Sequence, residues 1–92
     1  MKEYLIERNI SGAGKMDDEQ LRAVIAKSNQ ALAKLGPDVQ WQQSFVTDDS
    51  VFCVYFANDK NLVKKHAEMV GLPADRILEI RRTVDPSVDA AA

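Results

Sequence analysis

The sequence predicts an α+β fold made of one antiparallel sheet and two helices. First, the 92 residues are enough for one domain with a single core. Second, apolar residues recur at helical spacing in two segments, whereas four other segments have the composition or alternation of strands. Third, these segments follow the order strand, helix, strand, strand, helix, strand. This is the ferredoxin-like βαββαβ order, in which both helices lie on one face of a four-stranded antiparallel sheet.

The four expected strands are short and differ in character. Residues 2–8 (KEYLIER) alternate between apolar and charged side chains, which is the period of a strand with one buried face. Residues 39–46 and 51–57 are rich in β-branched and aromatic residues, and the turn-forming stretch TDDS between them predicts a hairpin. The stretch RILEIRRTV, residues 76–84, is the last expected strand.

The first expected helix covers the stretch DDEQLRAVIAKSNQALAKLGP. Asp17 and Gln20 have the spacing of a capping box, and Gly36 with Pro37 ends the helix. Docking of its large apolar side chains would contribute on the order of 10 kcal/mol before conformational entropy is subtracted. The expected docking stripe consists of Leu21, Val24, Ile25, Ser28, Leu32 and Leu35.

The second expected helix lies in the stretch NDKNLVKKHAEMVGLP. Asn58 or Asp59 is the expected N-cap, and Gly71 with Pro73 ends the helix. The inward stripe of this helix consists of Leu62, Val63, Ala67 and Val70.

We expect residues 1–86 to form a single domain.

The end of the chain, residues 87–92, contains small and acidic residues without apolar periodicity. We therefore expect it to be a loosely ordered tail.

The two faces of the sheet are predicted from the alternation of side chains along each strand. The more apolar set on each strand is assigned to the helices. That set is Tyr4, Ile6, Phe52, Val54, Phe56, Leu78 and Ile80, and the opposite face then carries Leu5, Glu7, Trp41, Gln43, Phe45, Cys53, Tyr55, Ile77, Glu79 and Arg81. The opposite face is too aromatic to remain in water, so we expect a second copy to cover it, as in a dimeric α+β barrel. Glu7, Glu79 and Arg81 on this face either take part in a binding site or only form ion pairs at the rim of the dimer interface.

Composition and charge exclude several classes of function. Twelve basic and fourteen acidic residues give a net charge of −2, without the basic, aromatic stripe of a nucleic-acid binder. The segment after Met1 is too charged for a signal peptide, and no apolar run is long enough to span a membrane. We therefore expect a cytoplasmic protein that binds neither nucleic acid nor membrane. The single cysteine, Cys53, cannot form an internal disulfide and is expected to be buried and inert.

A glycine-rich stretch and the only histidine are two further candidates for a binding or catalytic role. The stretch SGAGKMD resembles a phosphate-binding loop, but it has Asn9 and Met16 where a P-loop needs Gly and Ser or Thr. The only histidine, His66, lies three and four residues after Val63 and Leu62, at the edge of the expected helix–sheet seam. It is either a hydrogen-bonded structural residue or a ligand and proton-transfer group.

The whole chain resembles the domain-of-unknown-function 4242 family, small bacterial proteins that include a nickel-binding member with a dimeric ferredoxin-like fold. The resemblance rests on YLIERNISGAGK, LGPDVQWQQSFVTDD, CVYFA, KKHAEMVGLPADRILEIRR and the closing VDP. Members often have histidine at the position of Gln43 and an acidic or small residue at the position of Phe56. His66 matches a family histidine, and recurrent positions are also matched by Glu7, Trp41, Cys53, Tyr55 and Glu79.

The resemblance implies a small dimeric binding protein, not an enzyme, that takes nickel or another divalent transition metal. The implied metal ligands are His66, Glu7 and Glu79. The candidate small-ligand site combines family positions with neighbours on the same expected face, and consists of Glu7, Trp41, Gln43, Cys53, Tyr55, Glu79 and Arg81. The alternative is a cofactorless monooxygenase or isomerase of the dimeric α+β barrel type, with Trp41 and Tyr55 shaping a pocket for a small aromatic or lactone-like compound.

Overall fold

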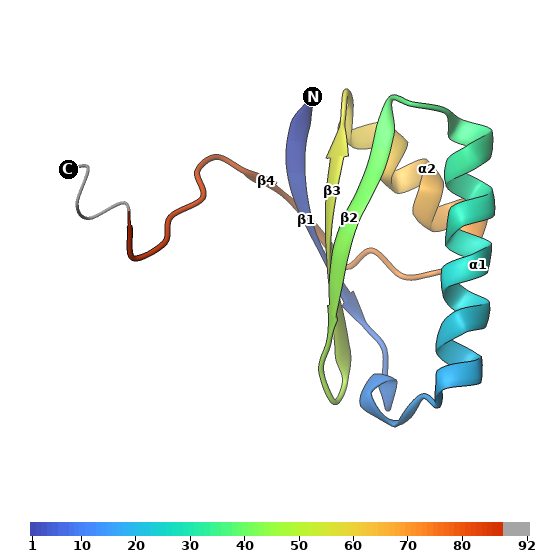
Figure 1. The fold of residues 1–92 in the computed structure, drawn as a ribbon. Coiled ribbons are helices and arrows are strands. Elements are labelled where there is room, and N and C mark those ends of the chain that lie inside the picture. The colour runs from blue at the N-terminus through green and yellow to red at the C-terminus, as the bar shows by residue number, and fades with distance from the viewer. Residues whose placement is uncertain (88–92) are drawn as a thin grey trace.

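The computed structural model describes residues 1–87, which form one α+β domain (Figure 1). The expected order of elements is confirmed, with one short 3₁₀ helix in addition. The expected tail, residues 87–92, lies outside the described residues except for Ser87. The elements are β1 (Lys2–Asn9), η1 (Ala13–Lys15), α1 (Asp18–Leu35), β2 (Val39–Val46), β3 (Ser50–Ala57), α2 (Lys60–Val70) and β4 (Arg76–Ile80).

The four strands form one antiparallel sheet in the order β2-β3-β1-β4. Both helices lie on the same side of this sheet (Figure 1). The two central strands, β1 and β3, are neighbours in space although α1 and β2 separate them along the chain. This arrangement is the ferredoxin-like fold that the sequence predicts.

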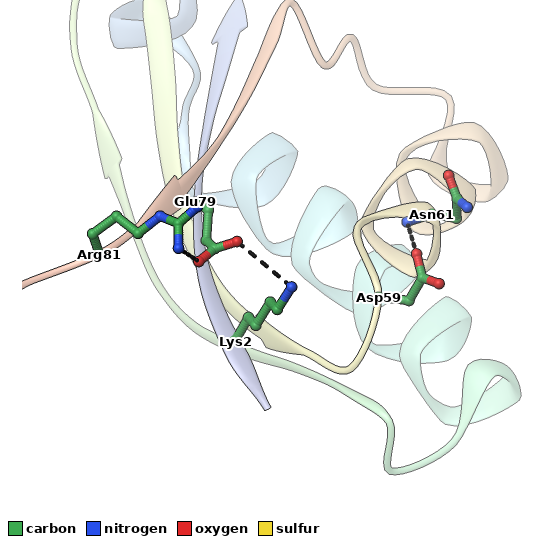
Figure 2. Close-up of polar contacts among 5 residues, drawn as sticks. All are labelled: Lys2, Asp59, Asn61, Glu79 and Arg81. Atoms are coloured by element: carbon green, nitrogen blue, oxygen red, sulfur yellow. Dashed lines mark hydrogen bonds and ion pairs between the residues drawn. The ribbon is translucent and has the colours of Figure 1, made fainter.

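Both helices begin and end where local sequence signals place them. The carboxylate of Asp17 accepts a hydrogen bond from the backbone N–H of Gln20, and the Gln20 side chain accepts one from the N–H of Asp17, which completes the capping box. Asp59 caps α2 by accepting from the N–H of Asn61 at 2.7 Å (Figure 2). Gly71 ends α2 in the left-handed conformation, at φ 76°.

Strand β4 is shorter than the predicted segment 76–84. It pairs with β1 from Arg76, opposite Glu7, to Ile80, opposite Glu3. The prediction of a strand is therefore confirmed for residues 76–80 and wrong for residues 81–84, which form no ladder. Strand propensity of the sequence RRTV is not sufficient without a paired backbone.

The glycine-rich stretch that resembles a phosphate loop has a packing role. Its backbone lies against the β2–β3 turn, where the N–H of Gly14 donates to the carbonyl of Asp48 at 3.0 Å. A Cβ on Gly14 would lie 2.9 Å from the Cα of Asp48, which is closer than van der Waals contact allows. Gly12 has a φ of 74°, a conformation that residues with a Cβ rarely adopt. Gly14 is thus required by the close approach of two loops, and Gly12 by its left-handed backbone conformation.

The assignment of residues to the two sheet faces is confirmed for β1 and wrong for much of the remaining sheet. Tyr4 and Ile6 face the helices as expected. However, the helix-facing side also carries Trp41, Cys53, Tyr55, Ile77 and Glu79, which the sequence pattern assigns to the opposite side. The opposite side, called the open face below, carries the apolar residues Leu5, Phe45, Phe52, Val54, Phe56, Leu78 and Ile80 together with Glu3, Glu7, Gln40, Gln43 and Arg76.

Strand register explains the error, because directly paired residues of an antiparallel ladder point to the same face. Tyr4 is paired with Tyr55, and Ile6 with Cys53, so all four must face the helices. Choosing the more apolar set on each strand separately ignores this coupling, and a shift of one residue reverses a strand's faces.

A β-bulge adds a second reversal on β2. The register shifts between Trp41 and Gln43, so Trp41 faces the helices while Gln43 lies on the open face. Simple alternation would have placed both residues on one face.

Candidate ligand pocket and the surroundings of His66

An apolar pocket lies between the first half of α1 and the helix-facing side of the sheet. Its volume is about 400 Å³, near the lower end of the range of about 300 to 1,000 Å³ that is usual for small-molecule sites. Leu21, Val24 and Ile25 line it and are only half-buried. The fully buried residues of α1 are Ser28 and Ala31. The first turns of α1 therefore do not dock on the sheet as completely as their apolar stripe predicts.

The walls of the pocket come from almost every part of the domain. Strands β2 and β3 form the side opposite α1, and residues from the loops before α1 and after α2 complete the lining. The lining residues are Arg8, Ile10, Met16, Leu21, Val24, Ile25, Ser28, Trp41, Ser44, Val46, Val51, Cys53, Tyr55 and Leu72. This composition suits a ligand with a largely apolar body.

Arg8 is the one charged residue of this lining and is only 1% exposed. Its Nη1 donates to the carbonyl of Pro73 at 2.7 Å, and its Nε donates to the Sγ of Cys53 at 3.5 Å. The remaining nitrogen, Nη2, is buried and has no hydrogen-bond partner. Neither ion pair among residues 1–87 includes Arg8. A buried guanidinium without a counter-ion is unfavourable by several kcal/mol unless a bound anion compensates it.

A chain of hydrogen bonds joins the pocket residues on β2 and β3 to Arg8. The indole Nε1 of Trp41 donates to the Oγ of Ser44 at 2.9 Å, and that hydroxyl donates to the Sγ of Cys53 at 3.0 Å. The thiol of Cys53 is buried, as expected from the sequence, and its sulfur accepts from both Ser44 and Arg8. These contacts hold the polar side of the pocket in one arrangement.

Tyr55 lies between the pocket and α2 and stays protonated at neutral pH. Burial, together with the neighbouring Cys53, raises the pKa of Tyr55 to about 12, although the charge of Arg8 and a hydrogen bond from its side chain act in the opposite direction. Its hydroxyl can therefore donate a hydrogen bond at physiological pH. The Tyr55 ring is also packed against the ring of His66, with the two centroids 5.3 Å apart.

His66 is completely buried between α2, α1 and the sheet. Its Nε2 lies 3.2 Å from the carbonyl oxygen of Ser28, and since a carbonyl only accepts, Nε2 carries the proton. The other nitrogen, Nδ1, is buried and has no partner. Burial lowers the pKa of His66 below its ordinary value of 6.5, an effect that Arg8 strengthens and the bond to Ser28 opposes. This environment fits a neutral histidine that joins α2 to α1. In this arrangement neither ring nitrogen of His66 is accessible to a metal ion.

The acidic residues that the resemblance implies as ligands are not grouped around His66. Glu7 lies on the open face, on the other side of the sheet. Glu79 lies at the β4 edge, where its carboxylate pairs with Arg81 at 3.2 Å and Lys2 at 3.8 Å (Figure 2). Within residues 1–87, no three His, Cys, Asp or Glu side chains are placed to hold a metal ion.

The implied small-ligand residues are likewise divided among three places. Trp41, Cys53 and Tyr55 meet at the pocket. Gln43 and Glu7 lie on the open face, and Glu79 pairs with Arg81 at the sheet edge.

Sequence reasoning missed Arg8 and Ser44, although one signal was present for Arg8. The alternation of Tyr4 and Ile6 continues to Arg8, so the inward face of β1 ends in a charge. A charged residue at an inward strand position indicates a buried ion and hence a site. Ser44 could not have been found in this way, because the bulge at Gln42 changes its face.

The fold and the pocket define a small ferredoxin-like α+β protein with a partly open apolar pocket on one side of the sheet and, among residues 1–87, no element covering the other side. A model of the family described as "Nickel responsive protein SCO4226-like" matches residues 4–80, and the chain belongs to this family. This family is compatible with the resemblance found in the sequence. The match does not itself carry the domain-of-unknown-function 4242 label.

A comparison with solved structures gives the same fold. The chain is similar to SCO4226 from Streptomyces coelicolor A3(2), with a TM-score of 0.72, 18% sequence identity, and coverage of 89% of this chain and 99% of that one. The search of curated proteins found no match. No helix within residues 1–87 is both long enough and apolar enough to cross a membrane.

Proposed function

We propose that the protein is a homodimeric binding protein in which the open faces of two copies pack against each other. The observation that supports this is the apolar open face. Phe45 is 53% exposed and Leu78 is 42% exposed, and both lie on this face. Large contiguous apolar patches are uncommon on soluble monomers and often mark an interaction site. A two-fold dimer buries the same patch on both copies, which suits a sheet that is apolar on each side.

We further propose that the protein binds Ni(II) weakly, through side chains of the open face. The family description suggests a response to nickel. His66 does not fit as a ligand in this fold, because its Nε2 is bonded to Ser28 and its Nδ1 is buried. Glu7 and Gln43 on the open face offer oxygen donors, and a dimer would supply each of them twice. Oxygen donors bind Ni(II) less well than imidazole, so the affinity is expected to be low.

Titration calorimetry with Ni(II) on the tag-free protein tests this proposal. We expect weak binding by the unaltered chain and weaker binding by Glu7→Gln, which removes one charge from the open face. Gln43→His should strengthen binding by about tenfold or more, because it adds an imidazole where relatives often carry one. His66→Gln should leave the nickel affinity unchanged.

The matched control is Gln30→His, which adds the same side chain on the exposed surface of α1. It should give no such gain. Tight native binding that is lost in His66→Gln would contradict the proposal, because the ring would then have to leave its buried position. Equal gains from Gln43→His and Gln30→His would show that the open face holds no metal site.

A further inference from the structure

We propose that the pocket beneath α1 binds a small organic monocarboxylate with an apolar body, whose carboxylate pairs with Arg8. This inference goes beyond the nickel response and concerns the opposite side of the sheet. It rests on two independent features of the pocket, its apolar lining and the unpaired charge at its inner end.

The apolar part of the ligand is indicated by the two long walls. On one side Leu21, Val24 and Ile25 present aliphatic side chains, and on the other side Trp41 and the strands β2 and β3 provide an aromatic and aliphatic surface. A pocket of about 400 Å³ has room for a compact hydrocarbon chain or a single aromatic ring system, because it approaches the size of ordinary small-molecule sites. A wholly polar ligand would leave these walls without contacts.

The carboxylate is indicated by Arg8. Its Nη1 and Nε are used by Pro73 and Cys53, whereas Nη2 makes no hydrogen bond of ordinary geometry, and the neutral hydroxyl of Tyr55 interacts with the guanidinium without supplying a counter-ion. A guanidinium stays protonated at every physiological pH, so a charge is present at this point whether or not a ligand is bound. A carboxylate would supply the missing acceptor and the missing counter-ion together.

Neighbouring groups favour an anion over a neutral ligand. Tyr55 lines the same pocket and carries a hydroxyl group that can donate to a carboxylate oxygen, whereas the hydroxyl of Ser44 already donates to Cys53. None of the lining residues is acidic, so no carboxylate of the pocket competes with that of the ligand. An amine of the same shape would place its charge against Arg8 and should be rejected.

The guanidinium is nearly shielded from water, which sets how the ligand must enter. Arg8 is 1% exposed, although it lines the pocket. A carboxylate that reaches Nη2 must therefore displace side chains that close over it, a change of rotamer that commonly accompanies binding.

Trp41 provides a direct readout, because it is the only tryptophan of the chain and lines the pocket. Its fluorescence should change saturably when octanoate is added. Octanol, which has the same alkyl chain without the charge, should bind at least about tenfold more weakly, the factor expected for one charge-assisted hydrogen bond. Octylammonium should bind more weakly still.

Two pocket variants and one control locate the effect. In Arg8→Met the preference for octanoate over octanol should fall to about one, and the fold should persist because an apolar side chain replaces an unpaired buried charge. Val24→Phe narrows the pocket and should weaken both ligands. Arg22→Met removes an equal charge from the exposed side of α1 and should leave the preference intact.

The proposal is overturned if octanoate causes no saturable change, if octanol binds as tightly as octanoate, or if octylammonium is accepted equally. These comparisons use the unaltered chain and do not depend on the folding of any variant. A preference for octanoate that survives in Arg8→Met would also overturn it, because the anion would then be bound elsewhere.

Discussion

His66 and Arg8 are both buried polar residues, but they differ in how the fold treats their charge. His66 can give up its proton, and its surroundings hold it neutral, with Nε2–H bonded to Ser28 and Nδ1 without a partner. Arg8 cannot become neutral and keeps a charge beside an apolar pocket. The single histidine, which attracts attention in the sequence, is therefore held neutral within the packing of this fold, while Arg8 is the residue on which the proposed ligand site depends.

The neutral state of His66 predicts a specific dependence of stability on pH. Its pKa in the folded chain is lower than the value of 6.5 in the unfolded chain, so the unfolded state binds more protons in the acidic range. The stability that neutral His66 contributes to the fold is fully present above the unfolded pKa of 6.5. It is lost as the pH falls from about 6.5 toward the folded pKa. Urea unfolding between about pH 7.5 and about pH 5 should therefore show a falling free energy of unfolding.

His66→Gln is the matched variant for this measurement. Glutamine can still donate to Ser28 but does not titrate, so we expect a loss of roughly 1 to 3 kcal/mol at neutral pH and a shallower fall toward acid. The carboxylates titrate in both proteins and cancel in the comparison. Identical pH profiles for the two proteins would mean that His66 is protonated in the fold without penalty.

Among the elements, α1 is packed more closely along its second half than along its first turns. The capping box holds its first residues, whereas the buried residues Ser28 and Ala31 lie in its second half, where the carbonyl of Ser28 accepts a hydrogen bond from His66 of α2. The loop before α1 depends in turn on its contact with the β2–β3 turn, through Gly12 and Gly14. The position of α1, and with it the pocket, is therefore linked to a glycine-rich loop.

Gly14→Ala tests this link. Alanine at an ordinary φ normally stabilises a loop slightly, but here its Cβ would lie 2.9 Å from the Cα of Asp48. We expect the free energy of unfolding to fall by about 1 to 3 kcal/mol, as in other overpacked sites. Thermal unfolding measured beside Ser11→Ala, an exposed change in the same loop, provides the comparison. A Gly14→Ala protein as stable as the native chain would show that the two loops separate easily.

At the scale of the whole molecule, the sheet has two apolar faces and the helices cover only one. The helix-facing side buries Tyr4, Ile6, Cys53 and Tyr55 in the core. The open face carries three phenylalanines and four aliphatic residues with no covering element among residues 1–87. A small domain buries a limited share of its surface by itself, so association would add stability that the single chain lacks.

Light scattering should accordingly report twice the mass of one chain. Phe45→Glu and Leu78→Glu place charges on the open face and should raise the dissociation constant by about tenfold or more each. Ala26→Glu, on the exposed side of α1, is the matched control and should leave the dimer intact. A native chain that stays monomeric at high concentration would contradict the proposed dimer. Unlike these changes, Trp41→Ala should act on the pocket and the core, because Trp41 faces the helices.

The order of elements, the helix boundaries and the ferredoxin-like arrangement follow from the amino-acid sequence, because caps, glycines and apolar periodicity act over a few residues. Which face of each strand meets the helices follows only from the folded sheet, since it depends on register with β1 and on the bulge at Gln42. The tertiary structure also placed Trp41, Cys53 and Tyr55 around Arg8 and separated His66 from Glu7. A candidate site joins residues that are distant in the sequence. When both faces of a sheet are apolar, the hydrophobicity of a strand residue does not indicate which face it lies on, and hence which residues it contacts.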